Sequence, residues 1–166
     1  MSNHSRDRSA TRNNPIVYAL LGGLIAATLD IVYAFVFFGF RGVSATRVLQ
    51  SIASGLLGSR AYEGGVSTAL IGFVLHFALM LIIALIFHVA ARRIPPLIRH
   101  PITIGAAFGI VVYWVMNLVV LPLSAFPGTF AFDPVIVPTG LLVHAFLIGV
   151  PIAMSVRRGI SGARGA

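Results

Sequence analysis

Four apolar segments separated by short polar stretches dominate the pattern of the chain. They cover residues 16–40, 66–91, 102–126 and 139–156. An α-helix rises about 1.5 Å per residue, so each segment can cross a hydrocarbon layer of about 30 Å, the last one only just. The period-two alternation of a membrane β-barrel strand is not seen. The sequence therefore predicts an all-α fold, a bundle of four transmembrane helices.

A shorter helix is predicted between the first two spans, at residues 44–58. Apolar and polar side chains alternate there at helical spacing, with Val48, Leu49, Ile52, Ala53 and Leu56 set against Arg47, Gln50, Ser51 and Ser54. Such a two-sided helix is typical of a segment that lies in the membrane interface. We expect it to rest on the outer surface, either as a connector or as a lid over a cavity or a partner surface.

The composition indicates a single membrane domain. Of the 166 residues, 58% are hydrophobic and 10% are charged, whereas soluble domains carry about 25% charged residues. We expect a polar tail over residues 1–14, a four-span membrane domain over 15–158 and a second tail over 159–166. The segment 16–40 is longer than the apolar core of a signal peptide, about 7 to 15 residues, so the first span is expected to be retained.

The arginines give the expected orientation. All 12 basic residues are Arg, and the formal net charge is +8. Nine of them lie on one side of the predicted spans, namely Arg6, Arg8, Arg12, Arg92, Arg93, Arg99, Arg157, Arg158 and Arg164. The other side has only Arg41, Arg47 and Arg60, offset by Glu63 and Asp133. The positive-inside rule then places both termini in the cytoplasm, in a multi-pass protein of the cell membrane.

The basic residues are expected to contact lipid rather than nucleic acid. They flank apolar spans, where arginines signal topology and meet anionic lipid headgroups. The basic tails are also short and contain no aromatic residues that would stack on bases. The lipid bilayer is therefore the predicted partner, and no nucleic-acid partner is expected.

Four polar residues inside the predicted spans form the candidate site: Asp30, His76, Asn117 and His144. An Asp at the centre of a membrane helix costs about 2.5 to 3.5 kcal/mol, so Asp30 is expected to face protein, water or a partner charge. Helical rise places all four in the middle or outer half of the bilayer. We predict a buried polar cluster in which His76 is the preferred partner of Asp30. His88 is expected at the cytoplasmic interface near Arg92.

Small residues accompany these polar side chains and predict close helix packing. Gly23 and Ala27 share a helix face with Asp30, and Gly105 and Gly109 form a second small stripe in the third span. Small residues let the backbones of membrane helices approach closely. The same stripes are candidate contacts for a homo-oligomer or for a partner in a larger membrane complex.

No enzyme, metal site or cofactor is predicted. The chain has no Cys, and it lacks an HExxH motif, a Ser-His-Asp pattern and a glycine-rich phosphate loop. A carboxylate with two imidazoles is a recognised metal ligand set, but no His pair occurs at i, i+4. Haem between His76 and His144 would need the two residues level, and helical rise separates them by about 7 Å.

Two functions remain open for the cluster, and a third is less favoured. The first is a non-enzymatic integral membrane protein whose buried polar residues serve packing or assembly. The second is a small oligomeric proton-linked transporter or channel, in which Asp30 and His76 titrate while Asn117 and His144 line an outward cavity. The third is a membrane haem or metal protein.

The last three spans carry a resemblance to a known group of proteins. They contain His76-Phe77 early in the second span, a Pro-Leu-Ser run at 122–124, and a central His144 followed by Arg157-Arg158. In these features the chain resembles the YagU-like small inner-membrane proteins of bacteria. That group has no established biochemical activity, so the resemblance implies a membrane location and no reaction.

Overall fold

The computed structural model describes residues 14–129 and 132–164. All regular structure in these residues is helical, which confirms the all-α prediction. Four helical stretches are long and apolar enough to cross a membrane: Pro15–Gly39, Gly65–Arg93, Pro101–Leu123 and Ile136–Ala163. The four-helix membrane bundle predicted from the sequence is therefore the fold. Residues 1–13 of the predicted N-terminal tail, which include Arg6, Arg8 and Arg12, lie outside the described residues.

The first two spans are each one continuous α-helix. Helix α2 (Pro15–Gly39) begins after Asn14, whose side chain accepts a hydrogen bond from the Ile16 N–H at 3.0 Å. Pro15 suits the first helical position because its missing N–H would have no partner there. Helix α4 (Gly65–Arg93) is the second span, and the short 3₁₀ turn η2 (Pro95–Ile98) connects it to the third.

The third and fourth spans each contain a π-helical turn. The third consists of α5 (Pro101–Val115), η3 (Met116–Val120) and α6 (Leu121–Leu123). The fourth consists of α7 (Ile136–Val143), η4 (His144–Gly149) and α8 (Val150–Arg164). Pro122 and Pro151 follow the two π turns closely. A proline lacks an N–H and clashes with the carbonyl four residues before it, so a wider turn is a natural response.

The helix ends differ from the sequence prediction mainly in the fourth span. This span begins at Ile136 rather than 139 and continues to Arg164, so residues 159–164 extend the helix instead of forming a tail. The third span stops at Leu123 rather than 126, because Ser124 has an extended backbone. The Ser124 hydroxyl accepts a hydrogen bond from the Phe126 N–H at 3.2 Å and fixes this turn.

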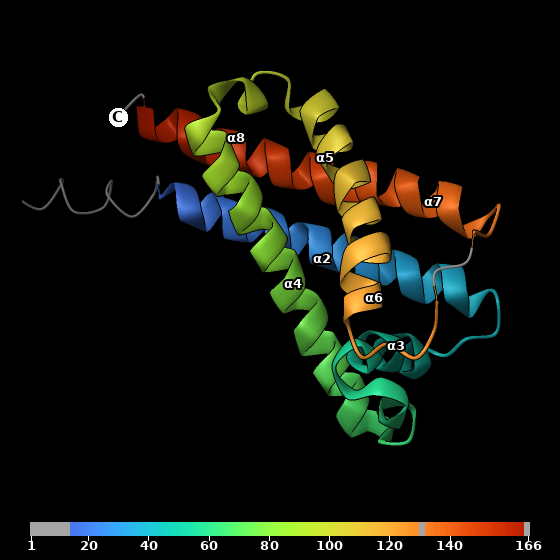
Figure 1. Cartoon of the computed structure of the whole chain (residues 1–166). Helices are drawn as coiled ribbons and strands as arrows, with labels where there is room; N and C mark the ends of the chain where they lie inside the picture. The colour runs from blue at the N-terminus through green and yellow to red at the C-terminus, as the bar shows by residue number, and fades with distance from the viewer. Residues whose placement is uncertain (1–13, 130–131, 165–166) are drawn as a thin grey trace, which may run out of the picture.

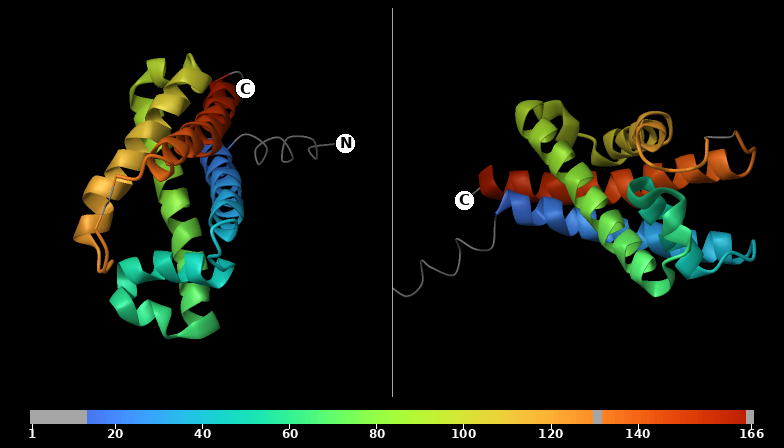
Figure 2. Two further views of the ribbon diagram at one scale, coloured as in Figure 1. Left: turned by 90° about the vertical axis from the view of Figure 1, so that its right-hand side faces the viewer. Right: turned by 60° about the horizontal axis from the view of Figure 1, so that its bottom comes forward.

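Helices α2 and α8 lie side by side (Figure 1). Helix α4 packs across α2, and α5 packs across η4 and α8 (Figure 2). The Phe87 and Phe108 rings bring α4 and α5 into contact with each other. The core lies where α2, α4 and α8 meet, and its fully buried members include Ala19, Ala26, Ala84, Phe87, Ile152 and Val156. Pro15 and Gly159 are in close contact, so the described ends of the chain share one end of the bundle. We call this the terminal end, and the opposite one the α3 end.

Helix α3 (Ala45–Leu57) and the 3₁₀ turn η1 (Gly58–Tyr62) connect the first two spans. Helix α3 matches the predicted segment 44–58, but its faces are not arranged as expected. Gln50 and Ser54 are buried, and the Gln50 side-chain amide donates to the Gly65 carbonyl at 3.1 Å, whereas Leu56 is exposed. The face turned toward the protein is therefore mixed, because Gln50 and Ser54 are buried beside Val48 and Ala53, and Gln50 pairs with a backbone group at the start of α4.

Candidate functional site

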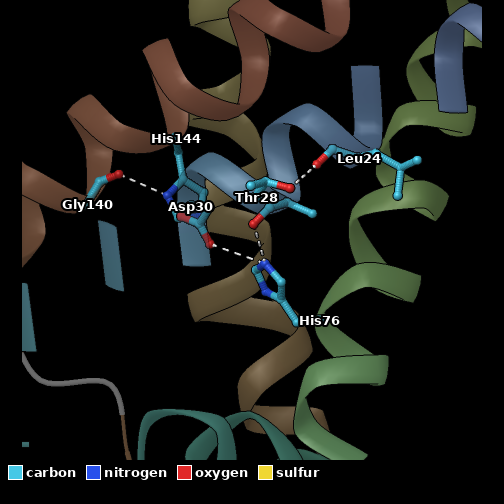
Figure 3. Close-up of polar contacts among 7 residues, drawn as sticks. Leu24, Thr28, Asp30, His76, Gly140 and His144 are labelled. Atoms are coloured by element: carbon cyan, nitrogen blue, oxygen red, sulfur yellow. Dashed lines mark hydrogen bonds and ion pairs between the residues drawn. The ribbon is translucent and has the colours of Figure 1, made fainter. Parts of the chain in front are cut away.

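Three of the four candidate residues converge in the structure. Asp30 comes from α2, His76 from α4 and His144 from η4, and their side chains point toward one another (Figure 3). The distance from His76 Nε2 to Asp30 Oδ2 is 4.0 Å. The Asp30 carboxylate interacts electrostatically with His144 and with His76. One polar side chain from each of three spans thus meets in a single cluster, which we call the polar cluster.

His76 also links two spans directly. Its Nε2 atom lies 3.0 Å from the carbonyl oxygen of Ala27, a residue 49 positions earlier in the chain. A carbonyl only accepts, so Nε2 carries the proton and donates it. The same N–H therefore lies between a backbone carbonyl and the Asp30 carboxylate. His76 and Ala27 are both buried, so this bond is shielded from solvent.

His144 is held by its own helix and by a tyrosine. Its Nδ1 atom donates to the Gly140 carbonyl at 2.9 Å, which fixes the ring at the first position of η4. The Tyr113 ring packs edge-on against the imidazole, with 5.1 Å between the ring centroids. Tyr113 is buried and brings α5 to the edge of the polar cluster, a role that the sequence did not predict. The absence of a side chain at Gly140 makes room for the Tyr113 ring, and this small residue was the available signal.

Asp30 is the least satisfied member of the polar cluster. Its side chain is 18% exposed, and none of the described residues donates a hydrogen bond to it. Most buried or half-buried polar side chains in proteins have such a donor. The carboxylate therefore lies beside two imidazoles (Figure 3) and is not fixed by hydrogen bonds from the described residues. Chains of Asp and His inside membrane proteins are also the groups that carry protons in pumps and transporters.

Asn117 does not join the polar cluster. It lies in η3, where its side-chain amide donates to the Tyr113 carbonyl of the same helix at 2.8 Å. It lines a groove of about 520 Å³ between α3, α4 and the end of the third span, together with Ser51 and Ser124. The predicted four-residue cluster is thus a three-residue cluster with Asn117 facing a different space.

The predicted packing residues lie at helix crossings inside the chain. A Cβ atom at Gly23 would be 3.0 Å from the Ala84 Cβ of α4, and one at Gly105 would be 2.7 Å from the Gly149 carbonyl oxygen. A Cβ atom at Gly109 would overlap the His144 carbonyl. Ala27 is fully buried beside them. These residues are occupied by contacts within one chain, so they do not supply the contacts for a second copy that the sequence suggested.

His88 is a further histidine within the second span. It lines a cavity together with Arg92, the neighbour that the sequence predicted, and it is buried, with 3% of its surface exposed. Neither of its ring nitrogens has a hydrogen-bond partner among the described residues. Among all the residues that the structure describes, no group of three or more His, Asp or Glu residues is arranged to hold a metal ion.

No protein-family model, curated protein or solved structure matches the chain. The class of the protein therefore rests on its fold and its site. Four apolar helices define a multi-pass membrane protein in contact with lipid. Its distinguishing feature is the polar cluster of Asp30, His76 and His144 between three of the spans.

Proposed function

We propose that this chain is a non-enzymatic membrane protein whose polar cluster holds three spans in a fixed arrangement for assembly in the membrane. The observation that carries the proposal is the hydrogen bond from His76 to the Ala27 carbonyl, which ties α4 to α2. Hydrogen bonds between membrane helices contribute about 0.6 kcal/mol on average and fix helix register. The attraction of Asp30 to His76 and His144 acts at the same junction.

The proposed location is the inner membrane, with both termini in the cytoplasm. Arg92, Arg93, Arg157 and Arg158 are exposed near the terminal end, and Arg99 lies in the adjoining turn. Arg41, Arg47 and Arg60 belong to the opposite side. This asymmetry supports a cytoplasmic terminal end by the positive-inside rule. The resemblance to YagU-like inner-membrane proteins supports the same location.

The second candidate function is a small proton-linked transporter or channel. The observation that favours it is the Asp30 carboxylate, which is partly exposed and receives no hydrogen bond from the described residues. A carboxylate that only packs would gain stability from such donors. In this second function Asp30 carries the proton, and His76, with its Nε2 atom 4.0 Å from the carboxylate, is the next group on its path.

Two measurements on the same variants separate these functions. Asp30→Asn, His76→Phe and the double variant are unfolded with SDS in mixed micelles, and each protein is also reconstituted in liposomes for proton flux. Thr28→Val is the matched control, because the Thr28 hydroxyl bonds the Leu24 carbonyl of its own helix and lies outside the polar cluster.

For the packing function, we expect each single variant to lower the unfolding free energy by about 0.5 to 2 kcal/mol, with non-additive effects in the double variant. The control should unfold like the wild type, and liposomes with the wild-type protein should leak no more protons than empty ones. A proton flux that Asp30→Asn abolishes without changing unfolding would reject the packing function and favour the transporter.

A further inference from the structure

Two cavities open beside the last turns of α4, and both include Arg92. The first, of about 460 Å³, is lined by Ile16, Leu85, His88, Val89, Arg92 and Arg93. The second, of about 390 Å³, is lined by Pro15, Arg92, Ile160 and Ala163. The guanidinium groups of Arg92 and Arg93 are both exposed, and neither forms an ion pair with a described residue. Arg92 and Arg93, which have no counter-charge among the described residues, thus border a space that can hold an anion.

His88 is the second, independent sign of a missing partner at this place. The side chain is buried in the wall of the first cavity, and neither ring nitrogen has a hydrogen-bond partner among the described residues. Orphaned buried polar groups of this kind are rare in native structures. Arg92 follows His88 by four residues, so both side chains lie on one face of α4, and both line the first cavity. An oxygen-rich anion held at Arg92 would therefore also lie near His88.

An apolar hollow continues from the arginines along α4. Its volume is about 500 Å³, and it is lined by Ile82, Leu85, Ile86, Val89, Ala90 and Arg93. The helical rise from Arg93 to Ile82 is about 16 Å, which matches half of a hydrocarbon layer of about 30 Å. Ile82, Ile86 and Val89 are each more than half exposed along this line. The hollow thus has the length and the chemistry of one acyl chain.

We propose that the terminal end of α4 binds one acidic phospholipid, with the phosphate at Arg92 and Arg93 beside His88 and an acyl chain along Ile86 and Ile82. The planar guanidinium fork of Arg suits a phosphate, which it can bind through two parallel hydrogen bonds. The headgroup of a zwitterionic lipid carries a positive charge, which Arg92 and Arg93 repel. An acidic lipid has a net negative charge, which the two arginines attract. A soluble phosphate would leave the apolar hollow empty.

The test uses the full-length protein in detergent, titrated with phosphatidylglycerol or phosphatidylcholine and observed by native mass spectrometry. We expect one phosphatidylglycerol to bind more tightly than phosphatidylcholine. The double variant Arg92→Gln/Arg93→Gln should weaken phosphatidylglycerol binding by about tenfold or more, since each basic residue near a lipid surface contributes about a factor of five. The matched control is Arg157→Gln/Arg158→Gln, which removes two exposed charges near the same end and should change binding by less than about twofold.

Two further variants test the other contacts. Ile86→Trp fills the apolar hollow without touching the arginines and should weaken phosphatidylglycerol binding while leaving glycerol phosphate binding unchanged. His88→Phe keeps an aromatic ring but removes both nitrogens, and should weaken binding of the acidic lipid.

Three results would overturn the proposal or part of it. Equal losses in the two arginine double variants would show a general effect of surface charge and no site. Glycerol phosphate that binds as tightly as phosphatidylglycerol, with no effect of Ile86→Trp, would show a soluble anion as the ligand. A His88→Phe variant that is more stable yet binds the lipid normally would remove His88 from the site.

Discussion

The crossing of α5 over η4 gives a sharp test of the structure through Gly109→Ala. A Cβ atom at this position would overlap the His144 carbonyl and lie 2.9 Å from the Ala145 Cα. Carbon atoms in ordinary contact are about 3.5 to 4.0 Å apart, so the two helices must separate by roughly 1 Å. Overpacking costs about 1 to 3 kcal/mol, and the upper value applies because both obstacles are backbone. Ala is the better helix former, so replacing a helical Gly by Ala also raises the unfolding free energy by up to about 1 kcal/mol.

The net expectation is a loss of about 2 kcal/mol in unfolding free energy. Trp114 is the single Trp of the chain and lies five residues beyond Gly109, with its ring 5.3 Å from that of Tyr113, which packs against His144. Its fluorescence during SDS titration in mixed micelles therefore reports on this crossing. Gly55→Ala is the matched control, because its new Cβ atom would lie 3.8 Å from the Ser124 Cβ, an ordinary contact distance. This variant should have the same unfolding free energy as the wild type or a slightly higher one. The reasoning fails if Gly109→Ala unfolds at the same SDS fraction as the wild type, or at a higher one.

Two other changes have expected outcomes that follow from single contacts. The backbone N–H groups of Ile136 and Val135 bond the Asp133 carboxylate and hold its pKa below the usual 3.8. The resulting stabilisation of α7 is complete above about pH 4 and is lost as the pH falls through the lower folded pKa. Hydrogen exchange at the start of α7, corrected for intrinsic rates, should show this loss in the wild type and not in Asp133→Ala; equal pH dependence in both contradicts it. Gln50→Leu removes the bond to the Gly65 carbonyl and should lower the unfolding free energy by about 1 to 2 kcal/mol. Ser51→Ala serves as its control because Ser51 bonds its own helix, and equal effects of the two variants would argue against the role of Gln50.

The spans were predictable because lipid imposes one simple requirement. Each must be apolar over enough residues to cross the membrane, and that property can be read directly from the chain. The convergence of Asp30 and His76 was predictable for a related reason. Helical rise gives the depth of a residue in its span, and the small residues around Asp30 indicate the face that meets another helix.

The position of Asn117 was not predictable from depth alone. Depth does not fix the direction in which a side chain points around the helix axis. The π turn η3 contains Asn117 and changes that direction relative to a regular α-helix. Pro122 was the available sign of an irregular turn, but it does not specify which residues the turn contains.

The burial of His88 depends on how other helices pack around the end of α4. In the structure α8 continues past Ile160, which belongs to the same buried core as Phe87 and Ala91. Ile16 of α2 lines a cavity together with His88. These are tertiary contacts, so no local pattern around His88 predicts its burial.

The close packing below Asp30 limits what the polar cluster can do in one chain. Toward the terminal end, a Cβ atom at Gly22 would be 2.8 Å from the Ser155 Cβ, and Ala26 and Ala27 are fully buried. These contacts pack α2 closely against α8 and α4 on the terminal side of Asp30. A proton path along α2 through this region would need α2 to move. A proton-linked function therefore requires α2 to separate from its neighbours, whereas the packing function requires that it stay in place.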